Sequence, residues 1–390
     1  MTDQKVIDRI DRAAFASMFI YAAAANTFPV CLVKMSEELS FNLTQAGLLG
    51  FITSLEQLLV LFLSCFAAAK FGKIKILKTA LLVLTGSLFL FSFSSTYLTT
   101  VALMLLIGLG YAFLEALLTP LVEDLHPKDS GSKMNLLHAS WPVGVCFAVL
   151  IVGELLSRGV SWRYVFMGLA ACTLIIFFFY PGAKKVNLPR SRTDFSHMGE
   201  ILAQPRFWAL GAGLFFAGAA EFSFAFWSAS YIQIHYGTLP RAGGFGAAAF
   251  AFGMVAGRMA SAKIIPKTGL KNLIIYSAVA GFMISLSFFF INGLILLYIF
   301  LFLMGLTIAC FWPSIQSYSA RVLPVDATIL MIFLSCFGVP GTSTASLLMG
   351  ILGDKFGLHI AFVVAPVSLI LLILSLLIEG KMKVGPVKAV

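Results

Sequence analysis

Charged residues are scarce in this chain of 390 residues. Asp, Glu, Lys and Arg make up 11% of it, whereas hydrophobic residues make up 60%. Soluble domains contain about 25% charged residues, because those side chains cover the surface that faces water. The scarcity of charge therefore excludes a soluble enzyme, a disordered protein and a secreted scaffold held by disulfides. The composition is instead typical of a protein that crosses the membrane many times.

Cysteine is also rare, and its placement excludes several kinds of site. The six cysteines all lie inside hydrophobic stretches, and no two of them form a Cys-x-x-Cys pair. We expect small packing residues rather than disulfides, and we expect neither a metal site nor a cofactor. A cleavable signal is not expected either, because the first hydrophobic stretch is too long for one.

Hydrophobic runs long enough to cross a bilayer follow one another along the chain. A spanning helix needs about 20 apolar residues, and short polar breaks such as Phe71-Gly72-Lys73 separate twelve such runs. We therefore predict an all-α polytopic membrane protein with twelve transmembrane helices. The predicted helices cover residues 13–33, 43–69, 76–95, 99–122, 133–157, 163–181, 206–235, 242–263, 272–291, 294–318, 327–352 and 359–379.

The longest polar break, residues 182–205, divides these helices into two groups of six. The predicted domains are an N-terminal six-helix bundle at 1–181, a cytoplasmic linker at 182–205 and a C-terminal six-helix bundle at 206–390. The two bundles match one another at a fixed offset of 197 residues without a gap. Glycines mark turns and close helix contacts, so this series of matches indicates an internal duplication. The matched pairs include Gly47 and Gly244, Gly72 and Gly269, Gly108 and Gly305, Gly144 and Gly341, and Gly153 and Gly350.

The basic residues are unevenly divided between the two sides of the predicted helices. With the N-terminus inside, 22 of the 27 Lys and Arg residues fall in breaks on the inner side. Cytoplasmic loops carry an excess of Lys and Arg, so we expect both termini in the cytoplasm and the protein in the inner (plasma) membrane of a bacterium. This topology accounts for the net charge of +10. Anionic lipid headgroups are therefore the expected neighbours, and nucleic acid is not.

Two parallel six-helix repeats are the plan of the major facilitator superfamily, in which the substrate site lies near the bilayer midplane. The segment Lys70-Phe71-Gly72-Lys73 resembles that superfamily's basic-glycine loop between helices 2 and 3. The resemblance implies a gating loop that includes Lys70, Gly72 and Lys73. In the superfamily an Asp normally precedes the first basic residue, whereas this chain has Ala69. The usual charge relay of the loop therefore lacks its acid.

Three glutamates lie well inside the predicted helices, where an ionised side chain costs about 2.5–3.5 kcal/mol. Glu56 and Glu221 lie near mid-depth, and Glu115 lies seven residues from the cytoplasmic end of its helix. His138 has a similar depth on the next helix, so its imidazole and Glu115 could come within hydrogen-bonding range. We predict that these four residues couple transport to protons. The alternatives are structural hydrogen bonds between helices and, for His138, a neutral ring held by a backbone carbonyl.

Aromatic and amide side chains lie at similar depths. Trp312 occupies the repeat position of Glu115. A cavity with carboxylates, amides and indole rings suits a small polyhydroxylated or zwitterionic solute, although tryptophan also serves as a packing residue or an interfacial anchor. The predicted substrate-binding residues are Asn26, Trp141, Glu221, Trp227, Tyr231, Trp312 and Gln316.

Three short segments resemble the fucose permease-like family of fucose–galactose–glucose:proton symporters. They are residues 110–115 in the fourth helix, 135–139 in the fifth, and 218–223 with Trp227 and Tyr231 in the seventh. The resemblance implies a functional Glu115 and a monosaccharide as substrate. The Asp that fucose permeases carry in helix 1 is absent, and Asn26-Thr27 stands in that region.

The leading hypothesis is a secondary active transporter that moves a small polar organic solute by alternating access, as a proton symporter and as a monomer. The alternative is a proton-driven exporter of drugs or amphiphiles, for which the 14 Met and 38 Phe residues would suit an apolar pocket. An enzyme is not expected, because the sequence contains no HExxH, GxSxG or nucleotide-binding GxxxxGK[ST] motif. A channel is disfavoured because the internal repeat is typical of alternating access.

Overall fold

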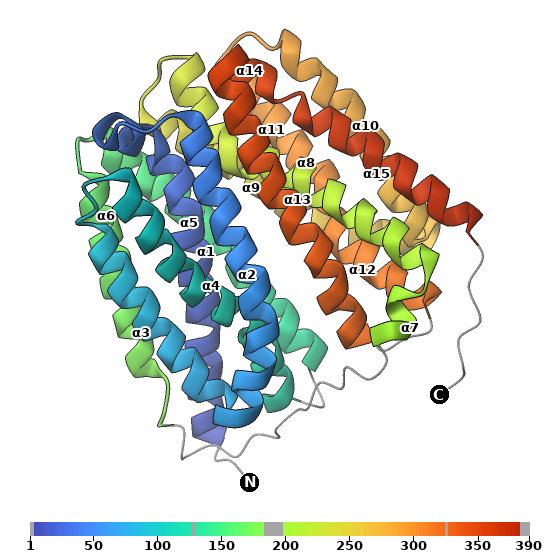
Figure 1. The fold of residues 1–390 in the computed structure, drawn as a ribbon, viewed down its shortest axis with the longest axis horizontal. Helices are drawn as coiled ribbons and strands as arrows, with labels where there is room; N and C mark the ends of the chain where they lie inside the picture. Colours follow the sequence, from blue (N-terminus) through green and yellow to red (C-terminus); the bar gives the residue numbers. More distant parts are fainter. Residues whose placement is uncertain (1–3, 127–129, 183–197, 324–326, 383–390) are drawn as a thin grey trace. The chain divides into compact units, whose positions relative to one another are not determined.

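The structure is a computed structural model that describes residues 4–126, 130–182, 198–323 and 327–382. No strand occurs in these described ranges, and the helices follow one another with short connections (Figure 1). The first repeat contains α1 (Gln4–Leu39), α2 (Leu43–Phe71), α3 (Lys73–Phe91), α4 (Tyr97–Leu125), α5 (Ser130–Ser157) and α6 (Trp162–Phe179). The second contains α8 (Pro205–His235), α9 (Pro240–Thr268), α10 (Leu270–Ser287), η2 (Phe288–Phe290), α11 (Leu294–Ile308), α12 (Phe311–Val322), α13 (Ala327–Phe356), α14 (Leu358–Ala361) and α15 (Val364–Lys381).

The prediction of twelve membrane-spanning helices is confirmed. Twelve segments of the described chain are long and apolar enough to cross a bilayer. Two of them are broken once, between α11 and α12 and between α14 and α15. In both cases a proline, Pro313 or Pro366, is the third residue of the helix that follows the break. Proline has no N–H and is tolerated in a first turn, where that N–H would lack a helical partner.

The chain forms two compact units. Unit 1 comprises Met1–Phe41, Leu55–Arg192 and Thr238–Gly244, and unit 2 comprises Asn42–Ser54, Thr193–Gly237 and Phe245–Val390. The long helices α2 and α9 therefore each begin in one unit and end in the other. Most of the predicted linker 182–205 lies outside the described residues, and its last part forms the short helix α7 (Met198–Leu202). The predicted domain boundaries at 181 and 206 stay a prediction.

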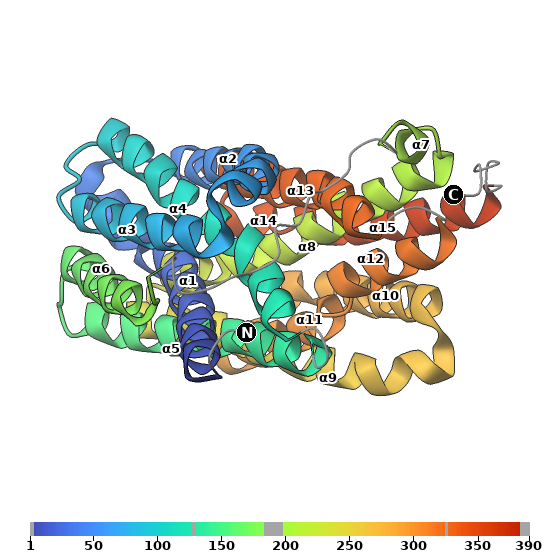
Figure 2. The same cartoon turned by 90° about the horizontal axis from the view of Figure 1, so that it is seen from below.

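Helix packing follows the same pattern in both units. In unit 1, α1 packs on α4, α5 and α6, and α3 packs on α4 and α6. In unit 2, the equivalent helix α8 packs on α12, α13 and α15, and α10 packs on α11, α12 and α15. Figure 2 shows α1 beside α5 and α8 beside α13 along their lengths. The duplication inferred from the glycines thus reappears as two similar sets of helix contacts.

The matched glycines lie where helix backbones touch. A methyl group added at Gly144 of α5 would meet the carbonyl oxygen of Phe19 on α1, and one at Gly341 of α13 would meet that of Phe215 on α8. Gly72 and Gly269 are another matched pair. They precede α3 and α10 with φ angles of 84° and 78°, which glycine adopts without steric cost. The repeat is therefore maintained where two helices touch at Gly144 and Gly341 and where a turn requires a positive φ at Gly72 and Gly269.

The first turns of α2 and α9 make a reciprocal pair of contacts. Within unit 2, Gly47 of α2 lies against the backbone of Ser346 on α13. Within unit 1, Gly244 of α9 lies against the carbonyl oxygen of Val149 on α5. Gly244 is 197 residues after Gly47, and Ser346 is 197 residues after Val149. The same offset therefore relates both members of the contact.

Candidate functional site

Glu115 of α4 lies among side chains from two neighbouring helices of unit 1. Its carboxyl group hydrogen-bonds with Tyr21 of α1, whose phenol also hydrogen-bonds with Gln57 of α2. Tyr111 lies one helical turn before Glu115, and its ring centroid is 5.1 Å from that of Tyr21. Helices α1, α2 and α4 therefore converge on one phenol and one carboxyl group.

An indole ring from a fourth helix completes this cluster. Trp141 of α5 packs edge to face on Tyr21 at a centroid distance of 4.7 Å. Glu115 is exposed, although it lies well inside a membrane-spanning helix. Facing hydrocarbon would cost an ionised carboxylate about 2.5–3.5 kcal/mol, and nearby Tyr21 is buried while Tyr111 and Trp141 are half-buried. We therefore expect the exposed side of Glu115 to face water rather than lipid.

His138 lies next to this cluster on α5. Its Nε2 atom is 3.3 Å from the hydroxyl oxygen of Thr119, and Thr119 lies one helical turn after Glu115 on α4. The predicted similarity in depth between His138 and Glu115 therefore holds. The His138 imidazole on α5 and the Glu115 carboxyl group on α4 are groups that can accept and release a proton. The Thr119 hydroxyl lies beside the imidazole.

Glu56 is half-buried on α2, beside Gln57. Its Oε2 atom is buried and finds no hydrogen-bond partner among the described residues. A buried carboxylate oxygen without a partner is costly when the group is ionised. Such an oxygen is satisfied by a proton of its own or by a solute that donates a hydrogen bond.

Glu221 has different surroundings in unit 2. It is half-buried on α8, and Arg258 of α9 interacts with it electrostatically. A cation within range stabilises the ionised carboxylate. Among the described residues, Glu56 and Glu115 take part in none of the ion pairs in the structure. The predicted proton-coupling glutamates therefore fall into two kinds, of which only the unit 1 kind lacks a nearby cation.

Trp312 and Gln316 lie on α12 and face α13 within unit 2. A methyl group added at Gly338 of α13 would collide with the Trp312 ring, and the Gln316 amide lies 3.5 Å from the hydroxyl of Ser335. Both side chains are half-buried. Their predicted contact with substrate stays a prediction, and in this structure they pack between two helices.

Trp227 and Tyr231, also predicted to contact substrate, are buried in unit 2. The Trp227 indole N–H donates to the carbonyl of Ser346 at 3.3 Å, and its exposed fraction is 0%. The Tyr231 hydroxyl lies 2.9 Å from Nδ1 of His359. In this structure both side chains join helices of unit 2, and their substrate role stays a prediction.

The remaining predicted residues lie in unit 1. The Asn26 amide donates to the carbonyl of Ala22 within α1 at 2.9 Å and is half-buried. In the predicted gating loop, Lys70 lies over the ring of the neighbouring Phe71. Lys73 is buried and forms an ion pair with Asp124 of α4 at 2.6 Å. Lys73 thus connects α3 to α4 inside unit 1.

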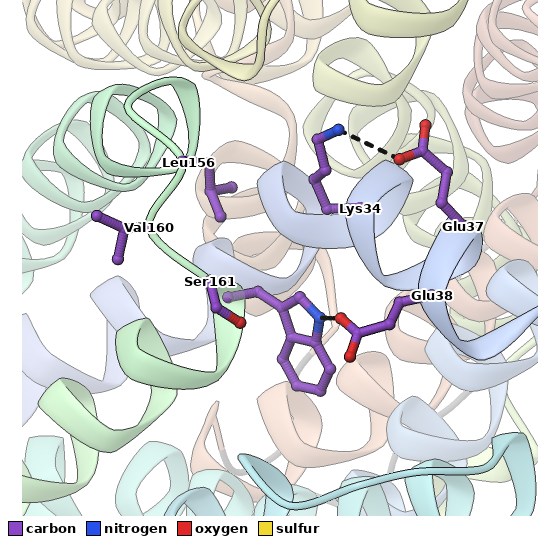
Figure 3. A pocket seen from close by; sticks show the side chains of 8 residues that line it. Lys34, Glu37, Glu38, Leu156, Val160 and Ser161 are labelled. Carbon is purple, nitrogen blue, oxygen red and sulfur yellow. Dashed lines mark hydrogen bonds and ion pairs between the residues drawn. The ribbon is translucent and has the colours of Figure 1, made fainter.

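A separate pocket of about 500 Å³ lies where α1 ends and α6 begins (Figure 3). Its polar wall includes Lys34 and Glu37, which form an exposed ion pair at 3.2 Å. Glu38 accepts from the indole N–H of Trp162 at 2.6 Å and from Arg163 at 2.7 Å. These donors hold Glu38 at the wall of the pocket. Glu38, Trp162 and Arg163 thus form a clamp that joins the end of α1 to the start of α6.

Comparisons with known proteins agree with this architecture. The family model described as Major Facilitator Superfamily matches residues 13–339. The chain belongs to the Major Facilitator Superfamily.

Solved structures of other transporters have the same fold as this superfamily member. The nucleoside transporter NupG matches with a TM-score of 0.80 at 12% identity, covering 97% of this chain and all of its own. A bacterial homologue of the human lysosomal transporter Spinster, in an inward-facing and unoccupied conformation, matches with a TM-score of 0.77 at 15% identity, covering 97% and 96%. No curated protein matches the sequence. Membership establishes a multi-pass membrane protein of a transporter superfamily.

Sequence reasoning missed three members of the Glu115 cluster in this superfamily protein. Tyr21, Tyr111 and Gln57 carry no motif of their own. Tyr111 was detectable, because it precedes Glu115 by four residues and shares its helix face. Tyr21 and Gln57 reach the site through packing of α1 and α2, which no spacing along the sequence reveals.

Proposed function

We propose that this protein is a proton-coupled symporter for a small, neutral, polyhydroxylated solute, of which a monosaccharide is the leading candidate. Glu115 binds the solute or the coupled proton, and Glu56 and His138 assist it. Transport proceeds by alternating access, as the two-repeat construction of the superfamily supports.

The observation that carries the proposal is the exposed Glu115 carboxyl group, which hydrogen-bonds with Tyr21, on which the Tyr111 and Trp141 rings pack. Sugars present hydroxyl groups to carboxylates and C–H faces to aromatic rings, so this combination suits them. Glu56 and Glu115 lack an ion-paired Lys or Arg among the described residues, which disfavours an anionic solute. The resemblance of segments 110–115 and 135–139 to the fucose permease-like family supports the same class of solute.

The excess of basic residues on one side of the helices supports an orientation with both termini in the cytoplasm. In that orientation, the start of α2 and the start of α9 face the outside. A proton gradient that is acid outside then drives the solute inward.

Uptake into proteoliposomes with an imposed pH gradient tests the proposal. We expect a panel of monosaccharides to contain a substrate whose accumulation requires the gradient. Glu115→Gln should lower gradient-driven accumulation at least 100-fold while counterflow exchange of the same solute continues, because exchange needs no net proton movement. Glu154→Gln is the matched control, because Glu154 pairs with exposed Arg158 at the end of α5 and should retain full uptake.

Two results would contradict this function. Unchanged gradient-driven uptake by Glu115→Gln would remove Glu115 from the coupling mechanism. Efflux of hydrophobic cations driven by the same gradient, with no response to any sugar, would favour a drug exporter instead.

A further inference from the structure

The repeat offset of 197 residues relates two chemically different clusters at the ends of the units. In unit 1, Glu38 of α1 accepts from Trp162 at the start of α6. The equivalent positions in unit 2 are His235 at the end of α8 and His359 in α14. An acid and an indole in one repeat are thus replaced by two imidazoles in the other.

The two imidazoles of unit 2 are stacked with nearly parallel planes. The ring centroids of His235 and His359 are 5.2 Å apart, and their planes differ by 15°. Tyr231 stacks on His235 at 4.8 Å and also lies near-parallel to His359 at 6.0 Å, and Phe288 stacks on His359 at 5.2 Å. The stack therefore joins α8, η2 and α14.

Hydrogen bonds hold His359 from two directions. Its Nδ1 atom lies 2.9 Å from the Tyr231 hydroxyl, and its ring also hydrogen-bonds with the backbone of Phe289. His359 is half-buried, whereas His235 is exposed. His235 is therefore the more accessible of the two imidazoles.

From this geometry we infer that the His235–His359 stack is an acid-sensitive latch that holds α14 on the end of α8. The closed stack accommodates one proton, because a single imidazolium keeps both of its hydrogen bonds and lies against aromatic rings. A second proton would place two like charges on rings whose centroids are 5.2 Å apart. When α14 separates from α8, both histidines are free to be protonated.

The groups that face the stack do not neutralise the positive charge that a second proton would add to it. Helix α8 presents Tyr231, His235 and the neighbouring Tyr236, and η2 presents phenylalanine rings and a backbone carbonyl. The end of α13 carries the exposed Asp354 and Lys355. Asp354 accepts from the backbone N–H groups of Leu43 and Thr44. This carboxylate is therefore held on the start of α2.

The expected pH range follows from histidine chemistry. Histidine in water has a pKa of about 6.5. Below that pH the open form binds one proton more than the closed form, so the opening equilibrium rises by up to about tenfold for each pH unit. In the proposed orientation this latch faces outside, and it would respond to the acidity that drives uptake. The clamp of unit 1 has an acid and an indole in these places and should not respond in this range.

Hydrogen–deuterium exchange of the full chain in lipid nanodiscs tests the latch without any transport measurement. After correction for the intrinsic effect of pH on exchange, we expect protection of residues 232–237 and 357–363 to fall at least tenfold between pH 7.5 and 5. Residues 35–40 and 160–166 of unit 1 are the internal control and should change less than twofold. Failure of the sugar-uptake assay would leave this measurement unaffected.

A double variant, His235→Phe with His359→Phe, keeps the stacked rings and removes both titrating groups. It should keep its protection at pH 7.5 and lose the acid response. Glu38→Gln in unit 1 is the matched variant and should keep the acid response of unit 2. An acid response that survives in the double variant, or that is equal in both units of the native protein, would overturn the latch.

Discussion

Arg9 and Arg206 occupy equivalent positions in the two repeats but bind different partners. Arg9 at the start of α1 donates to the carbonyl oxygens of Phe178 and Phe179, at 2.9 and 2.7 Å, where α6 ends. Arg206 at the start of α8 instead pairs with Glu379 of α15 at 2.9 Å. One repeat thus satisfies its arginine with main-chain oxygens that water can replace. The other uses a fully buried carboxylate, and this makes unit 2 more dependent on a single side chain.

A similar difference appears at the opposite ends of the helices. Asp354 of α13 caps the start of α2 by accepting from the N–H groups of Leu43 and Thr44, at 3.1 and 2.7 Å. The equivalent residue of α5 is Ser157, whose hydroxyl accepts from the N–H of Arg241 at 2.9 Å. Glycines that touch backbone are the same in both repeats, whereas polar partners differ. The two repeats therefore keep the same glycine contacts between helices but differ in the polar side chains that join those helices.

The largest difference between the repeats should appear when the buried carboxylate is removed. Lys271 lies 2.6 Å from Glu379, in addition to Arg206, and the carboxylate is 0% exposed. Glu379→Gln leaves two cations without their counter-ion, which costs about 3–5 kcal/mol for a buried pair. Thermal unfolding in nanodiscs should show a marked loss of stability for this variant.

The matched change in unit 1 is Arg9→Gln, which removes hydrogen bonds to carbonyls and leaves no charge unpaired. We expect a loss of about 1–2 kcal/mol. Glu154→Gln removes an exposed ion pair and should cost at most about 1 kcal/mol. Equal losses for Glu379→Gln and Glu154→Gln would refute the idea that unit 2 depends on its buried acid.

The fold was predictable because hydropathy and glycine spacing report directly on bilayer crossing and helix contact. Twelve spans and the repeat followed from these patterns, and Pro313 and Pro366 lie in the first turn after each of the two helix breaks. The exposed Cys172 contradicts the expectation that all six cysteines pack in the interior. A hydrophobic stretch in a membrane protein can face lipid as readily as the core, and hydropathy does not distinguish the two.

The candidate site was predictable only in part. Depth along a helix follows from counting residues, so His138 and Glu115 were expected at similar depths, and His138 lies beside Thr119, one turn after Glu115. The face of a helix that meets substrate does not follow from depth. Trp227 and Tyr231 share the region of Glu221 along α8, yet both are buried against other helices. In an almost uniformly apolar helix, no polar face indicates which side of the helix points toward the substrate.

The caps at α2 and α9 should show an intermediate effect. Asp354→Ala leaves two backbone N–H groups without their acceptor and should cost about 1–2 kcal/mol, whereas Ser157→Ala loses one neutral bond and should cost about 0.5–1 kcal/mol. Unfolding of both variants in the same nanodiscs measures the two losses of stability side by side. A larger loss for Ser157→Ala would mean that the carboxylate is not the stronger cap.

The smallest difference is expected where the repeats are most alike. Gly72 and Gly269 have φ angles of 84° and 78°, and a methyl group at either position meets no atom within 4 Å. Alanine is therefore disfavoured by backbone conformation alone, at a cost of about 1–3 kcal/mol per site. Gly72→Ala and Gly269→Ala should lower the free energy of unfolding by equal amounts, and the double variant should lose their sum. Gly86→Ala is the matched control, because that glycine lies within α3 and has open space around it. This change should stabilise the protein slightly, because alanine favours the helix more than glycine does. Unequal losses would show that one of the two turns carries a constraint beyond its backbone angle, and we expect such a constraint at Gly72, in the predicted gating loop.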